Sequence, residues 1–208
     1  MKKRQIGLLG IAVVAVAAAG IIGTTIAEPI TRTQNRVSAG SLEMDLVVDG
    51  EAAEESAVED AVSPGAKIDK TVEVKNTGDQ DMYVQVAVNK SWRTASGEPD
   101  TEADLEEIKL TLNENSGWKM LEEFSDSEVT YFYYEKPVKP GETTSSLMDS
   151  YSVLEENKEM NSNAYAGKQV KLDFEVDAVQ AVGGADAILA EWGLEAELSE
   201  DGTIISLQ

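Results

Sequence analysis

Neither cysteine nor histidine occurs in this chain of 208 residues, and 39 acidic residues face only 17 lysines and arginines. The absence of cysteine excludes disulfide bonds, thiolate metal ligands and cysteine nucleophiles. The absence of histidine excludes the usual zinc ligand, the Ser-His-Asp triad and the commonest general base. A formal net charge of −22 disfavours nucleic acid and anionic membrane surfaces as partners, because binding to either depends on lysine and arginine. These absences leave an acidic protein that lacks the common catalytic residues.

The first 27 residues have the pattern of a secretory signal peptide. Residues 2–4 are basic, and 16 of the 22 residues from 6 to 27 are Ala, Val, Ile or Leu. A basic start, an apolar stretch and a small residue at its end predict cleavage between Ala27 and Glu28. The alternative is an uncleaved anchor, because about 20 apolar residues can span a bilayer.

Cleavage predicts an exported protein, located in an extracellular matrix or at the cell surface. Signal peptidase is then a partner during export, and the membrane is contacted only through the uncleaved leader. Removing the three basic residues of the leader leaves 14 basic and 39 acidic residues, a net charge of −25. Core burial alone must hold the mature fold, because disulfide bonds are excluded.

Beyond the leader, apolar and polar residues alternate with a period of two, which is typical of strands that bury one face. Clusters of Gly, Pro, Asn and Asp separate these stretches and predict turns. The expected strands are residues 41–48, 67–75, 82–92, 108–112, 129–134, 146–154, 170–180 and 203–208. Many strands at this spacing predict an all-β protein, either an antiparallel β-sandwich or a barrel.

Helix is expected to be minor. Residues 185–192 predict one short helix that ends at Gly193, and residues 100–107 are a candidate for a second helical turn. Residues 41–208 are expected to form a single domain, preceded by an N-terminal arm, residues 28–40, that has little to bury. The acidic, alanine-rich stretch from Glu51 to Ala61 is expected to be a solvated loop. The prolines beyond the leader junction fall between expected strands: Pro64, Pro99, Pro137 and Pro140.

The many carboxylates raise the question of a calcium site, which needs six to eight oxygen ligands. The closest approaches are Asn76, Asp79 and Asp81, and Asp100, Glu102 and Asp104. Neither group matches the D-x-[DN]-x-[DN]-G pattern of a calcium loop. A solvated acidic surface that keeps an exported protein soluble is the favoured interpretation. No metal and no other cofactor is therefore predicted.

Enzymatic patterns are also incomplete. An aspartic protease needs Asp-Thr-Gly, whereas Asn76-Thr77-Gly78 lacks the Asp and Asp201-Gly202-Thr203 has the order scrambled. A glycosidase needs two facing carboxylates, which a linear pattern cannot exclude. Such enzymes usually line the cleft with aromatics, but the aromatic run at 131–134 is better explained as strand residues that alternate between core and surface. We therefore predict that the chain is not an enzyme and has no catalytic residues.

Three segments carry a shared pattern in order along the chain. Residues 35–46 read N-R-V-S-A-G-S-L-E-M-D-L, and residues 62–78 contain V-S-P-G-A followed by an alternating strand that ends in N-T-G. Residues 165–181 begin Y-A-G and end A-V-Q-A. Together they resemble the TasA/camelysin family of exported bacterial biofilm-matrix proteins, whose precursors are matured by a SipW-type signal peptidase. The middle of the chain, residues 95–160, matches only loosely, and Thr31-Arg32-Thr33 stands where relatives often carry aromatics.

The resemblance implies a jelly-roll-like sandwich that polymerises into extracellular fibres, with the same protein and other matrix proteins as partners. In the family's fibres the N-terminal arm of one subunit adds a strand to the next, which assigns assembly here to the arm residues Ile30, Thr31, Thr33 and Val37. Some relatives have been described as metalloproteases, but a chain without histidine cannot supply the zinc ligands of an H-E-x-x-H site. The predicted function is a secreted structural fibre protein. The alternative is a monomeric surface-associated module that binds a glycan or a protein, and an acidic secreted hydrolase is a more distant one.

Overall fold

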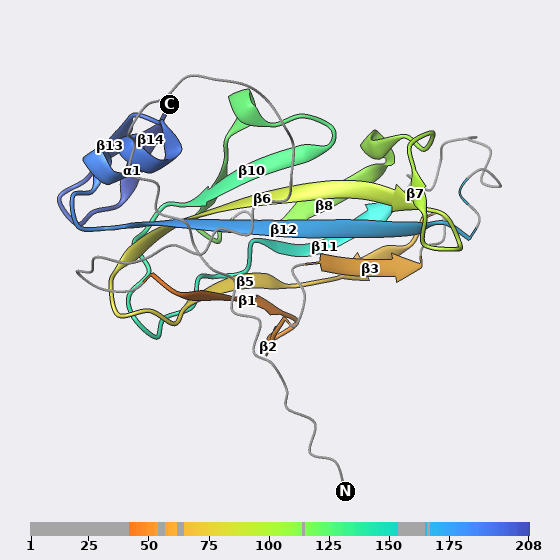
Figure 1. Ribbon diagram of the computed structural model, residues 1–208, viewed down its shortest axis with the longest axis horizontal. Helices are drawn as coiled ribbons and strands as arrows, with labels where there is room; N and C mark the ends of the chain where they lie inside the picture. The colour runs from red at the N-terminus through yellow and green to blue at the C-terminus, as the bar shows by residue number, and fades with distance from the viewer. Residues whose placement is uncertain (1–41, 54–56, 62–64, 114, 154–164, 166) are drawn as a thin grey trace, which may run out of the picture.

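The computed structural model describes residues 42–53, 57–61, 65–113, 115–153, 165 and 167–208. The predicted leader, its cleavage site and the arm therefore lie outside the described residues. All the strand pairs in the described part are antiparallel. The strands form two facing sheets with a smaller C-terminal unit at one end (Figure 1).

The first sheet has the strand order β3-β12-β6-β10-β9. Its strands are β3 (Ala57–Ala61), β6 (Met82–Arg93), β9 (Trp118–Met120), β10 (Val129–Tyr134) and β12 (Gln169–Gln180), with β7 (Pro99–Asp100) against the end of β6. The two central strands, β6 and β12, are each 12 residues long and pair from Gln169 opposite Arg93 to Gln180 opposite Met82. This continuous ladder runs the length of the molecule (Figure 1).

The second sheet consists of two groups of strands. One is β2 (Glu51–Ala52), β1 (Met44–Val48) and β5 (Val72–Asn76), and the other is β4 (Lys67–Asp69), β11 (Met148–Val153) and β8 (Ile108–Leu112). Residues 142–147, which lead into β11, join the groups by hydrogen bonding to β5. The Thr144 N–H donates to the Val74 carbonyl at 2.9 Å, and the Thr144 hydroxyl accepts from the Val74 N–H at 3.0 Å. A side-chain oxygen therefore stands in for a backbone carbonyl in this ladder.

Successive strands cross from one sheet to the other. The chain passes from β3 in the first sheet to β4 and β5 in the second, then to β6, β8, β10, β11 and β12 in alternation. Such crossing between two antiparallel sheets is the arrangement of a jelly roll. The predicted all-β antiparallel sandwich, jelly-roll-like and with short helical segments, is confirmed.

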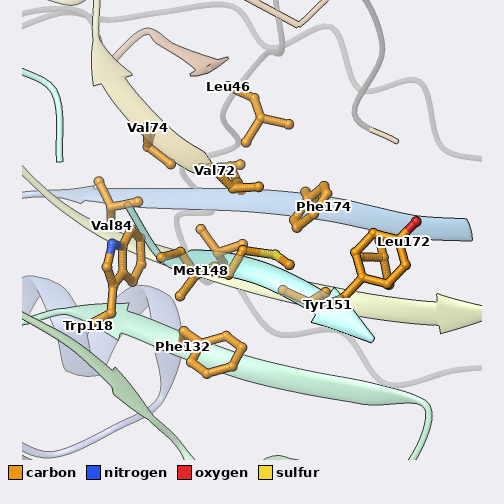
Figure 2. Close-up of a cluster of buried hydrophobic side chains, with 14 of the residues drawn as sticks. Leu46, Val72, Val74, Val84, Trp118, Phe132, Met148, Tyr151, Leu172 and Phe174 are labelled. Atoms are coloured by element: carbon orange, nitrogen blue, oxygen red, sulfur yellow. The ribbon is translucent and has the colours of Figure 1, made fainter. Parts of the chain in front are cut away.

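The core lies between the two sheets and follows from the alternation of apolar residues. Figure 2 shows Leu46 and Val72 of the second sheet meeting Val84, Phe132 and Phe174 of the first. All five side chains are buried, and they belong to one apolar cluster. The inward-facing positions of β6 and β12 supply much of it, because both strands are long and are flanked on both sides.

A C-terminal unit forms a third layer on the outer face of the first sheet. It consists of the helix α1 (Ala185–Trp192) and the hairpin β13 (Ala196–Leu198) and β14 (Ile204–Leu207). A second apolar cluster joins Tyr83 and Tyr133 of the sheet to Ile188 and Ile204 of the unit. The Tyr83 hydroxyl also donates to the Gly202 carbonyl at 2.7 Å, which ties the hairpin turn to the sheet.

Some expectations are corrected. The described residues of the stretch 51–61 are not a solvated loop, because β2 forms a hairpin with β1 and β3 pairs with β12 along its whole length. The expected strand 67–75 is divided into β4 and β5. Pro99 begins the short strand β7 rather than lying between strands, a position where a missing N–H is tolerated. The helical turn expected within 100–107 is the 3₁₀ helix η1 (Leu105–Glu107), and a second one, η2 (Glu122–Phe124), was not expected.

Candidate functional site

The residues predicted to act in processing and assembly all lie outside the described residues. They are Ala27, Glu28, Ile30, Thr31, Thr33 and Val37. The structure therefore bears on the other half of the predicted interaction, the sheet edges that could accept an added strand. An edge accepts a strand through its unpaired N–H and C=O groups.

Most edges of the sandwich are short, covered or acidic in the described part of the chain. β1 is covered at Val47 and Val48 by its hairpin partner and at Leu46 by the Ala53 N–H, which donates to the Leu46 carbonyl at 2.8 Å. β4 and β9 are three residues long. β3 has five residues but carries Glu59 and Asp60. Charges on an edge strand are a common protection against unwanted pairing.

β8 differs from these edges. It has five residues, Ile-Lys-Leu-Thr-Leu, with no acid among them, and within the described residues it pairs only with β11. Ile108 is buried, Leu110 and Leu112 are half-buried against the core, and Lys109 and Thr111 are exposed. The regular alternation of these side chains gives β8 the geometry of a strand ready to be flanked on its second side.

The backbone of β8 shows which groups point away from the sheet. Past its end, the Asn113 N–H donates to the Leu147 carbonyl of the neighbouring segment. At its start, the Ile108 N–H instead donates to the Leu105 carbonyl, and the Ile108 carbonyl accepts from Lys90 Nζ at 3.4 Å. Because alternate residues of a strand direct their backbone groups to opposite sides, those of Leu110 and Leu112 point outward.

One inward-facing residue of the edge strand β9 is exposed. Met120 of β9 is paired with Phe132 of β10, so both side chains are on the inner face of the first sheet. Phe132 is 1% exposed, whereas Met120 is 43% exposed. We call the incompletely buried residues Leu110, Leu112 and Met120 of these two edge strands the β8–β9 seam. At one end of it, the Trp118 indole N–H donates to the Ser145 carbonyl at 2.9 Å and links the two sheets.

Charges gather at the start of β8. Burial lowers the pKa of the Lys90 amine, and the positive charge of Lys109 lowers it further. Asp126, Glu106 and Asp104 oppose this shift. Acids thus outnumber the two lysines in this group, and the surroundings of the edge are net negative.

Two of the carboxylates considered for calcium serve local structure. Asp100 forms an ion pair with Lys168 and accepts from the backbone N–H groups of Glu102 and Ala103. Asp104 caps η1 by accepting from the Glu106 N–H at 2.9 Å. Within the described ranges, no group of three or more carboxylates is arranged to hold a metal ion.

The remaining motifs also have structural roles. The Asn76 side chain donates to the carbonyls of Gln80 and Val138, and accepts from the Gly78 N–H, so the N-T-G segment is a hydrogen-bonded turn. Asp201 accepts from the Thr203 N–H in the β13–β14 turn. The aromatic run 131–134 alternates between the two faces of β10, as predicted, although the C-terminal unit buries Tyr133.

No protein-family model, curated protein or solved structure matches this chain. In the part of the chain that the structure describes, no helix has the length and apolar character needed to cross a membrane.

The β8–β9 seam could not be foreseen from the sequence. The segment 118–120 is too short to show an alternation of apolar and polar residues. The sequence therefore gives no sign that it pairs with β10. The strand β8 itself was predicted residue for residue, but its position at an edge depends on pairing with β11, which a linear pattern does not specify.

Proposed function

We propose that this protein is a secreted structural subunit that assembles into extracellular fibres, in a biofilm matrix or at the cell surface. In this proposal signal peptidase removes residues 1–27, and the arm, residues 28–40, adds a strand to the next subunit. The partners are other copies of the chain and further matrix proteins. The resemblance of three segments to the TasA/camelysin family supports the proposal.

The observation that carries the proposal is the unprotected edge of β8. A sandwich that covers or charges its other edges leaves one five-residue strand, free of acids, with no strand on its outer side among the described residues. For a monomer this edge is an aggregation hazard, whereas for a fibre subunit it is a joint made of backbone hydrogen bonds. No catalytic role is assigned, and no cofactor is needed.

The test uses secreted protein whose N-terminus has been sequenced, imaged by negative-stain electron microscopy. Fibres are expected, most abundantly as the pH approaches the sequence pI of about 4.2, because repulsion between subunits falls there. Deleting residues 28–40 should abolish fibres and leave the circular dichroism spectrum of the sandwich unchanged. Fibres that persist after the deletion would refute strand donation by the arm.

A protein that stays monomeric from about pH 4 to 7 in size-exclusion chromatography would favour the alternative, a binding module for a glycan or a protein. The outer face of the first sheet would then be the surface to examine. Beyond the C-terminal unit it carries the polar side chains Asn89, Asp173 and Glu175, which adjoin one another across β6 and β12.

A further inference from the structure

We infer that the C-terminal unit is a proton-controlled cover on the outer face of the first sheet. The unit is held against the sheet while Asp177 carries a proton, and it opens more readily once Asp177 has lost that proton. The inference concerns a single copy of the chain, so it goes beyond the proposed function and does not depend on fibre assembly.

The position of Asp177 at the margin of the cover carries the inference. Asp177 lies on the outward face of β12, opposite Gln85 of β6. The next outward residue on one side, Val179, is 2% exposed and belongs to the apolar cluster of the C-terminal unit. The next outward residue on the other side, Glu175, is exposed. Asp177 is therefore a half-buried carboxyl group where the cover meets the open part of the sheet.

The groups that face Asp177 favour its neutral form. Glu175 of the same strand and Glu191 of α1 are both acidic, and Gln85 across the ladder carries no charge. Burial, followed by the charges of these two acids, raises the pKa of the Asp177 carboxyl, although the Ala178 N–H donates to it at 2.8 Å. The closed unit therefore binds this proton more tightly than the open one. Its hold on the sheet is strongest in acid and weakens as the pH rises through the raised pKa.

Trp192 of α1 adds a second cost to the closed state. Its indole N–H is buried and has no hydrogen-bond partner of ordinary geometry among the described residues. It lies close enough to Asp177 to favour the charged carboxylate, but this lowers the pKa by less than burial raises it. A buried carboxylate without a well-formed bond from the indole is costly, and neutralising it reduces that cost.

The connection between β12 and α1 has the conformation of a hinge. The chain passes through Gly183 and Gly184, whose φ angles are +90° and +46°, a region that glycine enters freely. A Cβ at Gly184 would lie 2.7 Å from the Leu198 side chain of β13, so Gly184 is packed against the unit itself. The unit would therefore open as one body, and opening would expose Tyr83 and Tyr133, which it now covers.

The tyrosines of this interface titrate in a different pH range. Burial, followed by the negative charge of Asp201, raises the pKa of Tyr83. Burial, followed by the charge of Glu135, raises the pKa of Tyr133. Both hydroxyls therefore stay neutral up to about pH 10, and neither contributes to a change between weakly acidic and neutral solution.

Hydrogen exchange followed by mass spectrometry tests the inference on the full chain. The protection of peptides from residues 185–207 is measured between about pH 4.5 and 8, relative to chemical exchange at each pH. Peptides from β6 report global unfolding. Asp177→Asn keeps the shape of the side chain and removes its charge. Asp173→Asn is the matched control, because Asp173 is also outward on β12 but forms an ion pair with Lys171 and lies opposite Asn89, away from the unit.

In the parent chain and in Asp173→Asn, protection of the C-terminal unit should rise by at least about threefold as the pH falls, whereas protection of β6 should change less. In Asp177→Asn it should be equally high across the whole range. Glu175→Gln removes one facing acid from an exposed position and should reduce the rise without abolishing it.

Three results would overturn the inference. They are a protection of the unit that does not depend on pH, a rise that persists in Asp177→Asn, and a rise that β6 shares in full, which would mean that the unit does not open by itself. If Asp177→Asn lost protection throughout β6 because it folds poorly, Glu175→Gln would decide, and a rise equal to that of the parent chain would count against Asp177.

Discussion

The two long sides of the sandwich are built differently. On the side of β3 and β4, the fully buried Tyr151 of β11 reaches across the sheets and its hydroxyl donates to Asp60 of β3 at 2.8 Å. On the other side, the Trp118 indole N–H and Lys90 Nζ donate to carbonyls of the facing sheet, and the inward-facing Met120 is 43% exposed. Apolar and polar residues alternate in the strands on both sides. What differs is whether a neighbouring strand or a long side chain closes the gap.

The largest difference in stability is expected between two substitutions, one at each residue of the cross-strand pair Phe132 and Met120. Phe132→Ala should lower the free energy of unfolding by about 3–5 kcal/mol, because it opens a cavity in the packed core. Met120→Ala, on the same face of the next strand, should lower it by less than about 1 kcal/mol, because its side chain is already exposed to water. Urea unfolding followed by tryptophan fluorescence measures both values. Equal losses would mean that the seam is as closed as the core.

The link on the closed side should have an intermediate effect. Tyr151→Phe removes the hydrogen bond to the half-buried Asp60 and should lower the free energy of unfolding by about 1–3 kcal/mol at neutral pH. Thermal unfolding of the two proteins measures it. A stability equal to that of the parent chain would show that packing alone closes this side.

The same residue predicts a pH dependence. Burial, followed by the hydrogen bond and the negative charge of Asp60, raises the pKa of the Tyr151 hydroxyl far above its ordinary value. The folded protein therefore keeps this proton when the unfolded chain begins to lose it, near pH 10. Stability should fall as the pH rises above about 10, and it should fall less steeply in Tyr151→Phe. Parallel slopes in alkaline unfolding curves would contradict the assignment to Tyr151.

The smallest effect is expected at the β1–β2 turn on the closed side. Burial raises the pKa of Asp49, but hydrogen bonds from Lys70 Nζ and the Thr71 N–H outweigh it, so the pKa is lowered overall. Lys70→Met should lower the free energy of unfolding by only about 0.2–1 kcal/mol at neutral pH, because the pair is partly exposed. The difference should vanish as the pH falls through the lowered pKa and Asp49 becomes neutral. A loss that is unchanged in acid would assign the effect to packing of the lysine stem.

Regularly patterned elements could be predicted from the sequence alone. The expected ranges of β8, β10 and α1 match the structure residue for residue, and β6 and β12 differ by one residue at one end. In these segments each apolar side chain lies on the face that meets a core, so local pattern and final packing agree.

The failures occur where pairing, and not pattern, makes the strand. β3 consists of small and acidic residues with Val58 as its only large apolar side chain, and its strand conformation comes from pairing with β12. The predicted strand 67–75 is divided because the chain moves from pairing with β11 to pairing with residues 142–147. The same distinction between pattern and pairing applies to the candidate site at β8. The strand could be predicted, but its status as an edge is a property of the whole topology.

The ladder between β5 and residues 142–147 also determines how the molecule responds to mechanical force. Any tension applied between β1 and β8 crosses the second sheet through the three-residue pairing of β4 with β11 and through this short ladder. There the hydroxyls of Thr144 and Ser146 accept from the N–H groups of Val74 and Val72 at 3.0 and 3.2 Å, in place of backbone carbonyls. The 12-residue ladder of β6 and β12 lies in the other sheet, outside that line of force. Under load the second sheet would therefore extend first at β5, while the central ladder of the first sheet keeps the domain folded.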